Sequence, residues 1–287
     1  MLFVPTVFAL DVSFDALYWR ATESFDWVMI NDRNVPNQHV TYRTANFQFD
    51  PGFRVGVGTQ GTWDTRLSYT RYYADMGASA TGKLTPTLLA SKMAQPSIGY
   101  FYQSGQIEFA IHYNVLDADF AKAFEWGERV YVRPLIGIRC AWIDQTIDTA
   151  LQGDISVSEN LENNFKGVGP KAGVNADFNF YQCNHKRAHL FANFSTAYLW
   201  GNWSIRDVLL DSNNRTIVIS NKNRNQASLG FEAALGLNLE YQDWSFKFSY
   251  EMSEWFNQFQ IFDDGTGGHS NDLVLQGLTL GLIYQFK

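Results

Sequence analysis

Long stretches of the chain alternate strictly between apolar and polar side chains. From 229 to 241 the odd positions hold Leu, Phe, Ala, Leu, Leu, Leu and Tyr, while the even positions hold Gly, Glu, Ala, Gly, Asn and Glu. Successive side chains of a β-strand point to opposite faces, so this period of two gives each strand one apolar and one polar face. The stretches 47–58, 168–180 and 244–252 divide in the same way.

The length of these stretches separates two kinds of sheet protein. A soluble β-sandwich also alternates, but its strands usually have about five or six residues. Here the alternation runs for about a dozen residues, the length that a tilted strand needs to cross a bilayer. The pattern therefore predicts an all-β fold, a transmembrane antiparallel up-and-down β-barrel of about ten strands, within a range of about 8–12.

The positions of the strands follow from the same alternation. Ten are predicted, at roughly 11–22, 45–60, 62–75, 104–125, 128–150, 161–181, 187–208, 223–242, 243–260 and 271–287. Short connections at 60–62, 125–127, 182–186 and 242–243 alternate with long ones at 23–44, 76–103, 151–160, 209–222 and 261–270. Bacterial barrels have short periplasmic turns and long extracellular loops, so both termini are predicted to be periplasmic.

One predicted strand changes phase. In 104–125 the apolar residues leave one face after Tyr113 and continue on the other from Leu116. One extra residue would restore a single apolar face, so the pattern predicts a β-bulge near Asn114–Leu116.

The predicted register assigns side chains to the two faces and to the strand ends. The predicted lipid-facing residues are Val55, Val57, Val174, Phe178, Leu229, Phe231, Leu235, Leu237, Phe246, Phe248, Leu280 and Leu282. Aromatic residues gather at the strand ends, where barrels carry girdles at the two membrane interfaces. The predicted interface aromatics are Trp19, Trp63, Trp126, Trp142, Trp200, Tyr241, Trp244, Tyr284 and Phe286.

The opposite face predicts a charged lumen. Its residues are Arg54, Arg66, Asp117, Asp119, Arg133, Arg139, Lys171, Asp177, Glu232, Glu240, Lys247 and Glu251. Such charges either brace the wall as ion pairs or form a constriction that selects solutes. The arginines belong to predicted strands in 45–75 and 128–150 and the glutamates to 223–260, so opposite walls are predicted to carry opposite charge.

Composition narrows the alternatives. No run of about 18 apolar residues occurs, which excludes a spanning helix. The formal charge is −7 with a pI near 5.2, which argues against a nucleic-acid partner. Cys140 and Cys183 form neither a CxxC motif nor a Cys/His cluster at zinc spacing, so no metal site and no cofactor are predicted. Their places in the predicted topology are too far apart for a disulfide.

The start of the chain has two interpretations. Residues 1–10 are typical of the remnant of a signal peptide, with Val7, Phe8 and Ala9 as the cleavage site. The positively charged N-terminal region with which signal peptides begin is missing. Alternatively, they begin the first strand. In either case 11–287 is predicted to be a single barrel domain.

Catalysis has weak support in the sequence. Of the five histidines, His269 alone is near a cluster of acids at a predicted rim, formed by Asp263, Asp264 and Asp272. A general base needs a positioned partner, and no second motif supplies one. The sequence predicts no catalytic residue and no enzyme.

Several blocks resemble one family, the Legionella-type major outer membrane proteins, which has relatives in chlamydia-like bacteria. The blocks are Phe14–Ala21, Phe49–Gly58, Tyr113–Asp119, Arg133–Ile143 and Gly167–Gly173. Their order from the first strand onward is more specific than any single block. The resemblance implies a pore-forming protein of the Gram-negative outer membrane. The alternating Leu280, Leu282, Tyr284 and Phe286 resemble the C-terminal signal for barrel assembly, although Lys287 follows.

Two functions remain open from the sequence. The first is a porin-like barrel with a narrow charged lumen for small polar solutes or ions. A barrel of about eight strands is filled by its own side chains and one of about sixteen holds an open channel, so about ten strands favour a narrow lumen. The alternative is a structural or adhesive barrel with a plugged lumen and partner-binding extracellular loops. The predicted partners are outer-membrane lipid, the barrel-assembly machinery through the C-terminal strand and a second copy of the chain.

Overall fold

A computed structural model describes residues 9–23, 26–32, 39–61, 63–87, 102–127, 129–184, 186–260 and 270–286, in which all regular structure is β-strand. The strands are β1 Ala9–Thr22, β2 Asp26–Asp32, β3 His39–Thr44, β4 Phe49–Gln60, β5 Asp64–Pro86, β6 Tyr102–Ala121, β7 Phe124–Trp126, β8 Val130–Gly153, β9 Val157–Cys183, β10 Lys186–Asp211, β11 Thr216–Tyr241, β12 Trp244–Gln260 and β13 Ser270–Phe286. No helix in these ranges is long and apolar enough to cross a membrane.

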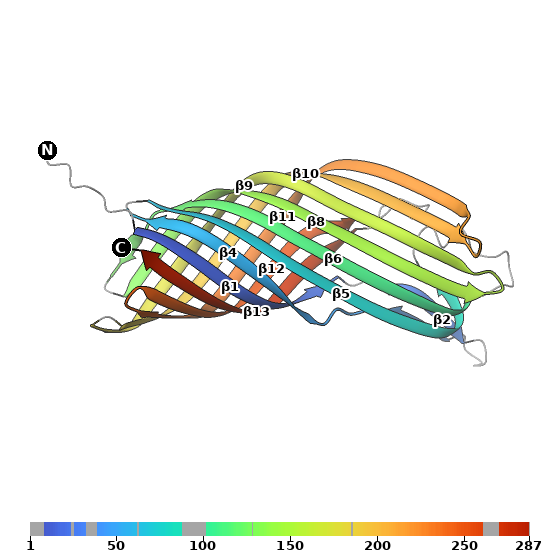
Figure 1. Cartoon of the computed structure of the whole chain (residues 1–287), viewed down its shortest axis with the longest axis horizontal. Coiled ribbons are helices and arrows are strands. Elements are labelled where there is room, and N and C mark those ends of the chain that lie inside the picture. The colour runs from blue at the N-terminus through green and yellow to red at the C-terminus, as the bar shows by residue number, and fades with distance from the viewer. Residues whose placement is uncertain are drawn as a thin grey trace.

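Ten of the described strands close into an antiparallel ring (Figure 1). Around the ring their order is β1, β4, β5, β6, β8, β9, β10, β11, β12 and β13. The ring closes because β13 returns to β1, from Leu10↔Phe286 to Thr22↔Val274. The β2–β3 hairpin pairs with the far end of β5, and β7 pairs with β8. The prediction of an all-β barrel of about ten strands is therefore confirmed.

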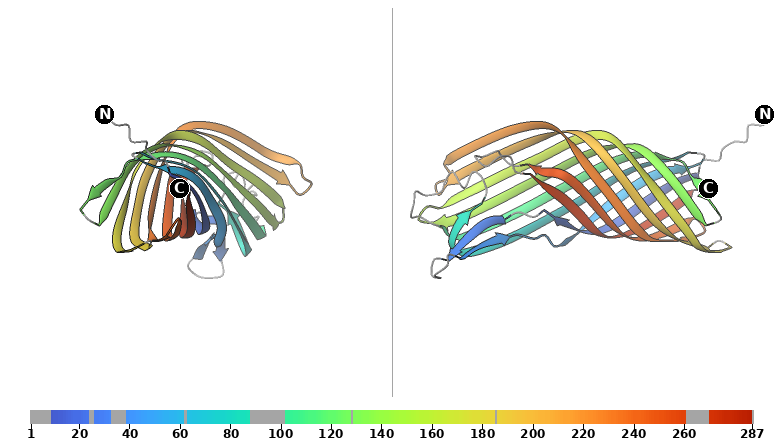
Figure 2. Two further views of the ribbon diagram at one scale, coloured as in Figure 1. Left: turned by 60° about the vertical axis from the view of Figure 1, so that its left-hand side comes forward. Right: turned by 180° about the vertical axis from the view of Figure 1, so that it is seen from behind.

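The two ends of the barrel differ. The first and last described residues meet at one end, together with the turn at 242–243 and the strand ends at Gln60, Asp64, Ala121, Cys183 and Lys186 (Figures 1 and 2). We call this the turn end. The opposite end, which carries β2 and β3, is the loop end.

The predicted strands are present, but several are longer than expected. β5 continues to Pro86, and β8–β9 and β10–β11 are joined at 154–156 and 212–215, inside the predicted long connections 151–160 and 209–222. The predicted loop 23–44 contains β2 and β3. Residues 1–8 lie outside the described residues, and Ala9 and Leu10 already belong to β1.

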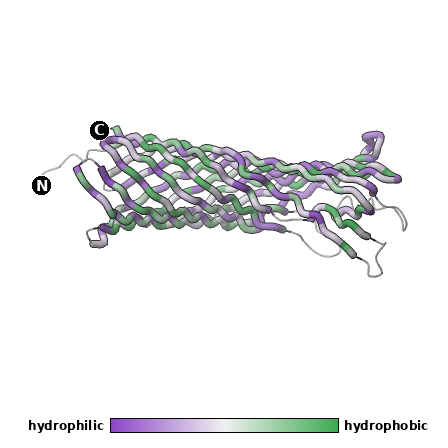
Figure 3. Tube along the Cα trace, turned by 90° about the horizontal axis from the view of Figure 1, so that it is seen from below, coloured by the Kyte–Doolittle hydropathy of each residue, from purple (hydrophilic) through white to green (hydrophobic). Residues whose placement is uncertain are grey.

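Halfway along the barrel, the apolar side chains of the strands change from the outward face to the inward face. In the turn-end half, apolar side chains point outward, such as Ile136 and Leu235, which are 65% and 66% exposed. In the loop-end half, apolar side chains point inward, such as Phe109 and Phe165, which are buried. Figure 3 shows hydrophobic and hydrophilic residues alternating along the strands throughout. We call the loop-end half the extension.

The exchange of faces explains the phase change in β6. Ile107, Phe109, Ile111 and Tyr113 are buried inside the barrel, whereas Phe120, nearer the turn end, is exposed outside. The ladders of β6 with β5 and β8 run without a register shift through 107–121. The predicted bulge near Asn114–Leu116 is therefore wrong, because the environment of the two faces changes rather than the register.

The outward apolar band has the height of a bilayer core. It runs from Leu10 to Tyr18 on β1 and from Trp244 to Met252 on β12, about nine residues in each case, close to the ~9–11 residues that a tilted strand needs. Beyond the band, polar residues such as Asn160 and Asp148 point outward, and their side chains are hydrogen-bonded to each other.

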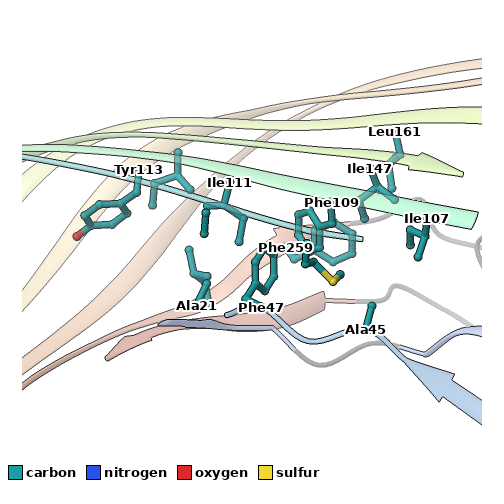
Figure 4. Close-up of a cluster of buried hydrophobic side chains, with 14 of the residues drawn as sticks. Ala21, Ala45, Phe47, Ile107, Phe109, Ile111, Tyr113, Ile147, Leu161 and Phe259 are labelled. Carbon is teal, nitrogen blue, oxygen red and sulfur yellow. The ribbon is translucent and has the colours of Figure 1, made fainter. Parts of the chain in front are cut away.

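Apolar side chains fill the interior of the extension, and we call this cluster the plug. Its larger members are Trp19, Trp27, Phe47, Tyr72, Leu84, Tyr102, Phe109, Tyr113, Phe165, Leu199, Trp203, Trp255 and Phe259. Phe109 packs against Phe47, with ring centroids 5.0 Å apart, and against Phe259, at 6.1 Å (Figure 4). Phe47, which the alternation placed on the outward face, is only 2% exposed because the chain at 45–48 turns into the interior ahead of β4.

Two glycines make room for one of these rings. Gly167 and Gly201 are paired on β9 and β10, and Phe165 lies over both. A Cβ on Gly201 would come 1.9 Å from the ring of Phe165, and one on Gly167 would come 2.5 Å from it. The bare backbone lets Phe165 pack against Trp203, with centroids 4.4 Å apart.

The exchange of faces predicts opposite outcomes for one substitution at two places on β11. Leu235→Arg sits in the apolar band and should lower the free energy of unfolding in lipid by about 2–4 kcal/mol. Asn223→Arg lies on the same outward face of the extension and should change it by less than about 0.5 kcal/mol. Denaturant unfolding in vesicles measures both, and equal losses would contradict the location of the band.

Candidate functional site

The turn-end half of the barrel encloses a polar lumen of about 870 Å³. The cavity reaches residues beside the short turns, such as Gln242 and Gln285. Of the twelve residues predicted for the lumen, Arg139 is buried among other side chains of the interior, and the other eleven line the cavity: Arg54, Arg66, Asp117, Asp119, Arg133, Lys171, Asp177, Glu232, Glu240, Lys247 and Glu251.

One group of charges joins β1, β4 and β12. Arg54 of β4 contacts Glu251 of β12 at 3.0 Å and Asp15 of β1 at 3.2 Å. Lys247, also on β12, contacts Glu251 at 3.0 Å and Asp15 at 3.7 Å. Two cations thus share two carboxylates, and the side chains span the interior across the intervening strands.

A second group joins β6, β8, β9 and β11. Arg139 of β8 donates two hydrogen bonds of 2.7 Å to Asp117 of β6 and one of 2.6 Å to Glu232 of β11. Lys171 of β9 contacts Asp117 at 3.1 Å and Asp119 at 2.9 Å. The two-point contact between Arg139 and Asp117 fixes the plane of the guanidinium group.

Nearer the turn end, the charges are more exposed. Arg66 contacts Asp11 at 2.9 Å, and Arg133 contacts Asp177 at 2.8 Å. His189 lies between acids, with Nε2 3.6 Å from Asp177 and Nδ1 3.8 Å from Glu240.

Two tryptophans separate the lumen from the plug. The guanidinium of Arg54 lies 5.6 Å from the ring of Trp19, and that of Arg139 lies 5.8 Å from the ring of Trp255. Both rings belong to the buried apolar cluster. Each cation therefore contacts acids on the lumen side and an aromatic face on the plug side, an arrangement that favours a cation over the ring.

The prediction that Trp19 is an interface aromatic is wrong. Trp19 is 3% exposed and points inward, where its Nε1 donates to Thr279 Oγ1 at 3.2 Å. The parity of β1 explains its orientation, because Trp19 shares the odd, inward positions with Asp11 and Asp15. Tyr18, on the other parity, is the exposed aromatic of this strand.

The other predicted interface aromatics are on the outside. Trp63, Trp126, Tyr241, Trp244 and Phe286 are exposed at the turn end, Tyr284 is half-buried beside them, and Trp142 and Trp200 are exposed where the apolar band ends. The predicted lipid-facing residues also point outward. Leu229, Phe231 and Leu237 are half-buried, and Val55, Val57, Val174, Phe178, Leu235, Phe246, Phe248, Leu280 and Leu282 are exposed.

The structure corrects the predicted electrostatics of the lumen. Arginines and glutamates were expected on opposite walls of a narrow lumen, where they would set up a field across it. Instead, Arg139 reaches Glu232 and Arg54 reaches Glu251 in direct ion pairs. Paired charges cancel most of each other's field, so they brace the wall rather than polarise a channel.

Asp11, Asp15 and His189 are among the residues of this site that sequence reasoning missed. Asp11 and Asp15 alternate with the exposed Leu10, Val12 and Phe14, so the period-two rule applied to 10–19 would have found them. The period-two pattern of β10 could not have shown the role of His189, because the acids that it contacts, Asp177 and Glu240, lie on the neighbouring strands β9 and β11.

No metal or catalytic centre is evident among the described residues. They contain no group of three or more His, Cys, Asp and Glu side chains that could hold a metal ion. Cys140 and Cys183 are both free cysteines. Of the rim cluster considered from the sequence, His269, Asp263 and Asp264 lie outside the described residues, and Asp272 accepts a hydrogen bond from the backbone N–H of Asn257 at 2.7 Å.

Comparison with known proteins identifies the family. The model of the Legionella pneumophila major outer membrane protein precursor family matches residues 4–286, nearly the whole chain. The chain belongs to the Legionella major outer membrane protein family. It is therefore an outer-membrane β-barrel, and the apolar band is its membrane-spanning part. A search of curated proteins finds no match.

Solved structures similar to this chain are outer-membrane barrels. The outer membrane protease OmpT of Escherichia coli is 9% identical, with 97% of each chain covered and a TM-score of 0.49. A major outer membrane protein of Thermus thermophilus is 13% identical, covering 98% of this chain and 100% of that one, with a TM-score of 0.44. Ail, the attachment invasion locus protein of Yersinia pestis, is 9% identical over 97% of each chain, with a TM-score of 0.27. Similarities this low concern the fold alone.

Removing Arg139 should destabilise the barrel far more than removing Arg133. Arg139→Ala leaves buried Asp117 without its main partner and should lower the free energy of unfolding by about 3–5 kcal/mol. The side chain of Arg133 is 39% exposed, so Arg133→Ala should cost no more than about 1 kcal/mol. Urea unfolding in micelles distinguishes the two, and similar losses would contradict the bracing role.

A buried carboxyl group in the extension predicts a pH dependence. Burial raises the pKa of Asp207, on β10, to about 6, and its side chain is hydrogen-bonded to Glu159. Because the folded-state pKa lies above the ordinary 3.8, the folded state holds this proton more tightly. The unfolding free energy should therefore fall as the pH rises from about 4 through about 6.

Asp207→Asn should remove that dependence and make the protein more stable than wild type at pH 8. The control is Asp148→Asn, which changes an exposed outward carboxylate of the extension. Unfolding curves at pH 4, 6 and 8 test this prediction. An unchanged slope in Asp207→Asn would assign the pH dependence to other groups.

Proposed function

We propose that the protein is a structural outer-membrane barrel whose lumen is closed to free diffusion and whose extension projects beyond the membrane. The observation that carries this proposal is the plug, in which Phe109 packs against both Phe47 and Phe259 in the interior. Close-packed aromatic side chains leave no aqueous path between them. The ion pairs of the lumen, on the turn-end side of the plug, obstruct the passage further.

The orientation of the barrel in the envelope is part of the proposal. Short turns of bacterial barrels face the periplasm. On this basis the turn end, with both chain termini, is periplasmic, and the extension faces the outside of the cell. The C-terminal strand β13, with exposed Leu280, Leu282 and Phe286, would engage the assembly machinery. Lipid would cover the apolar band.

A narrow pore is the second candidate, because the polar lumen of about 870 Å³ reaches the turn end. Conduction through this monomer would require the plug to move. The proposal includes no catalytic step. The hydroxyl of Ser245 donates to Asn238, whose amide contacts His189 at 3.2 Å, so the amide group of Asn238 stands between this serine and the imidazole.

Single-channel recording in planar bilayers tests this function. The wild-type protein should give no conductance steps. Phe109→Ala/Phe259→Ala empties the centre of the plug and should give steps or increased leak. Phe246→Ala/Phe248→Ala removes two outward rings of β12 and should stay silent.

Regular steps from the wild-type protein would contradict the closed barrel and favour the pore. In that case, neutralising Arg133 and Arg139 should shift the reversal potential toward cations, because fixed charges at a constriction set ion preference.

A further inference from the structure

Four buried polar residues lie together inside the apolar plug. Glu23 follows β1, Gln145 lies on β8, Asn163 on β9 and Gln258 near the end of β12. Glu23 is 2% exposed, and the other three are completely buried. Trp203 adjoins the cluster, since its Nε1 donates to the backbone oxygen of Gln258 at 3.0 Å.

Hydrogen bonds order three of these side chains and direct their donors toward Glu23. The Nδ2 of Asn163 donates to Gln145 Oε1 at 2.6 Å and to the backbone oxygen of Gln258 at 3.2 Å. The Nε2 of Gln145 then donates to Glu23 Oε2 at 2.5 Å. The oxygen of Gln145 is occupied by the bond from Asn163, so Asn163 Oδ1 is the amide oxygen of this pair that is left for another group.

Several buried polar atoms of this cluster lack a partner. They are Glu23 Oε1, Asn163 Oδ1, and both Oε1 and Nε2 of Gln258. Buried polar atoms in folded proteins nearly always have a partner, so several orphans at one place indicate a missing group. Three of the four are oxygens, which indicates a group that accepts oxygen lone pairs.

The charge of the cluster specifies that group further. Buried carboxylates are paired or coordinate a metal. Among the described residues Glu23 forms no ion pair. Burial raises the pKa of its carboxyl group well above the usual value, and nearby Asp272 raises it further, so the ionised carboxylate needs a cation that the protein itself does not place there. Carboxylate and amide oxygens are the ligands that hard cations prefer.

We propose that Glu23, Asn163 and Gln258 bind a hard divalent cation of the Ca²⁺ class inside the extension. The carboxylate oxygen Oε1 of Glu23 and the amide oxygens of Asn163 and Gln258 are the protein ligands, and water completes the coordination. With one carboxylate in direct contact, the site belongs to the weak class of extracellular calcium sites, with a Kd of about 10⁻⁴–10⁻³ M. The ion would tie β1, β9 and β12 together across the plug.

Ordered water is the alternative occupant, because water also satisfies clustered buried polar atoms. The two differ in charge: a cation site needs the carboxylate of Glu23, whereas a water site accepts the neutral amide in its place. This difference defines the test, which is independent of whether the barrel conducts.

Terbium luminescence on the full chain refolded in detergent micelles provides the readout, with Tb³⁺ standing in for Ca²⁺ and Trp203 as the sensitiser. The wild-type protein should give saturable emission that Ca²⁺ competes away. Glu23→Gln should weaken Tb³⁺ binding at least tenfold. The control Glu162→Gln removes an outward carboxylate next to Asn163 on β9 and should bind like wild type.

Gln258→Glu keeps the proposal testable if Glu23→Gln does not fold. It adds a second carboxylate at a side chain whose polar atoms have no partner, and it should strengthen Tb³⁺ and Ca²⁺ binding about tenfold. Calcium should also raise the thermal unfolding midpoint of the wild-type protein but not that of Glu23→Gln. Absent saturable emission, equal binding by wild type and Glu23→Gln, or no strengthening in Gln258→Glu would each overturn the cation site in favour of water.

Discussion

The strict alternation of side chains along unbroken ladders is the constraint on which the rest of this barrel depends. A strand cannot change which residues point inward without a bulge, so a chain that passes from lipid into water must change its composition instead. This chain does so on strand after strand. On β6, Phe120 faces outward in the band, while Phe109 faces inward in the extension. The position of the lipid surface is thus encoded in the composition of each face.

This exchange gives the two halves different interiors. Where lipid covers the outside, the inside carries charges, and these are held in close pairs such as Arg139 with Asp117 and Glu232. Where water surrounds the outside, the inside is packed with aromatic and aliphatic side chains, as in a soluble β-protein. Trp19 and Trp255 lie at the boundary between the two interiors. The ring of each contacts an arginine of the charged half on one side and packs against the plug on the other.

Much of this fold could be predicted from the sequence, and the errors share one cause. The ten strands of the ring and the faces of residues such as Leu235 and Glu232 follow from period two alone. The bulge expected near Asn114–Leu116 and the outward assignments of Trp19 and Phe47 all assumed that an apolar residue faces lipid. Ion pairs such as Arg54 with Glu251 could not be predicted, since they depend on the distance across the closed ring.

The continuity of the ladders also has a mechanical consequence. The β10–β11 ladder runs from Lys186↔Tyr241 to Leu209↔Val218 without a register shift, and so passes from the membrane wall into the extension without a joint. A load applied to the tip of this hairpin, at 212–215, would be borne by backbone hydrogen bonds in shear down to the turn end. The extension and the membrane-spanning wall are therefore expected to tilt together as one rigid body.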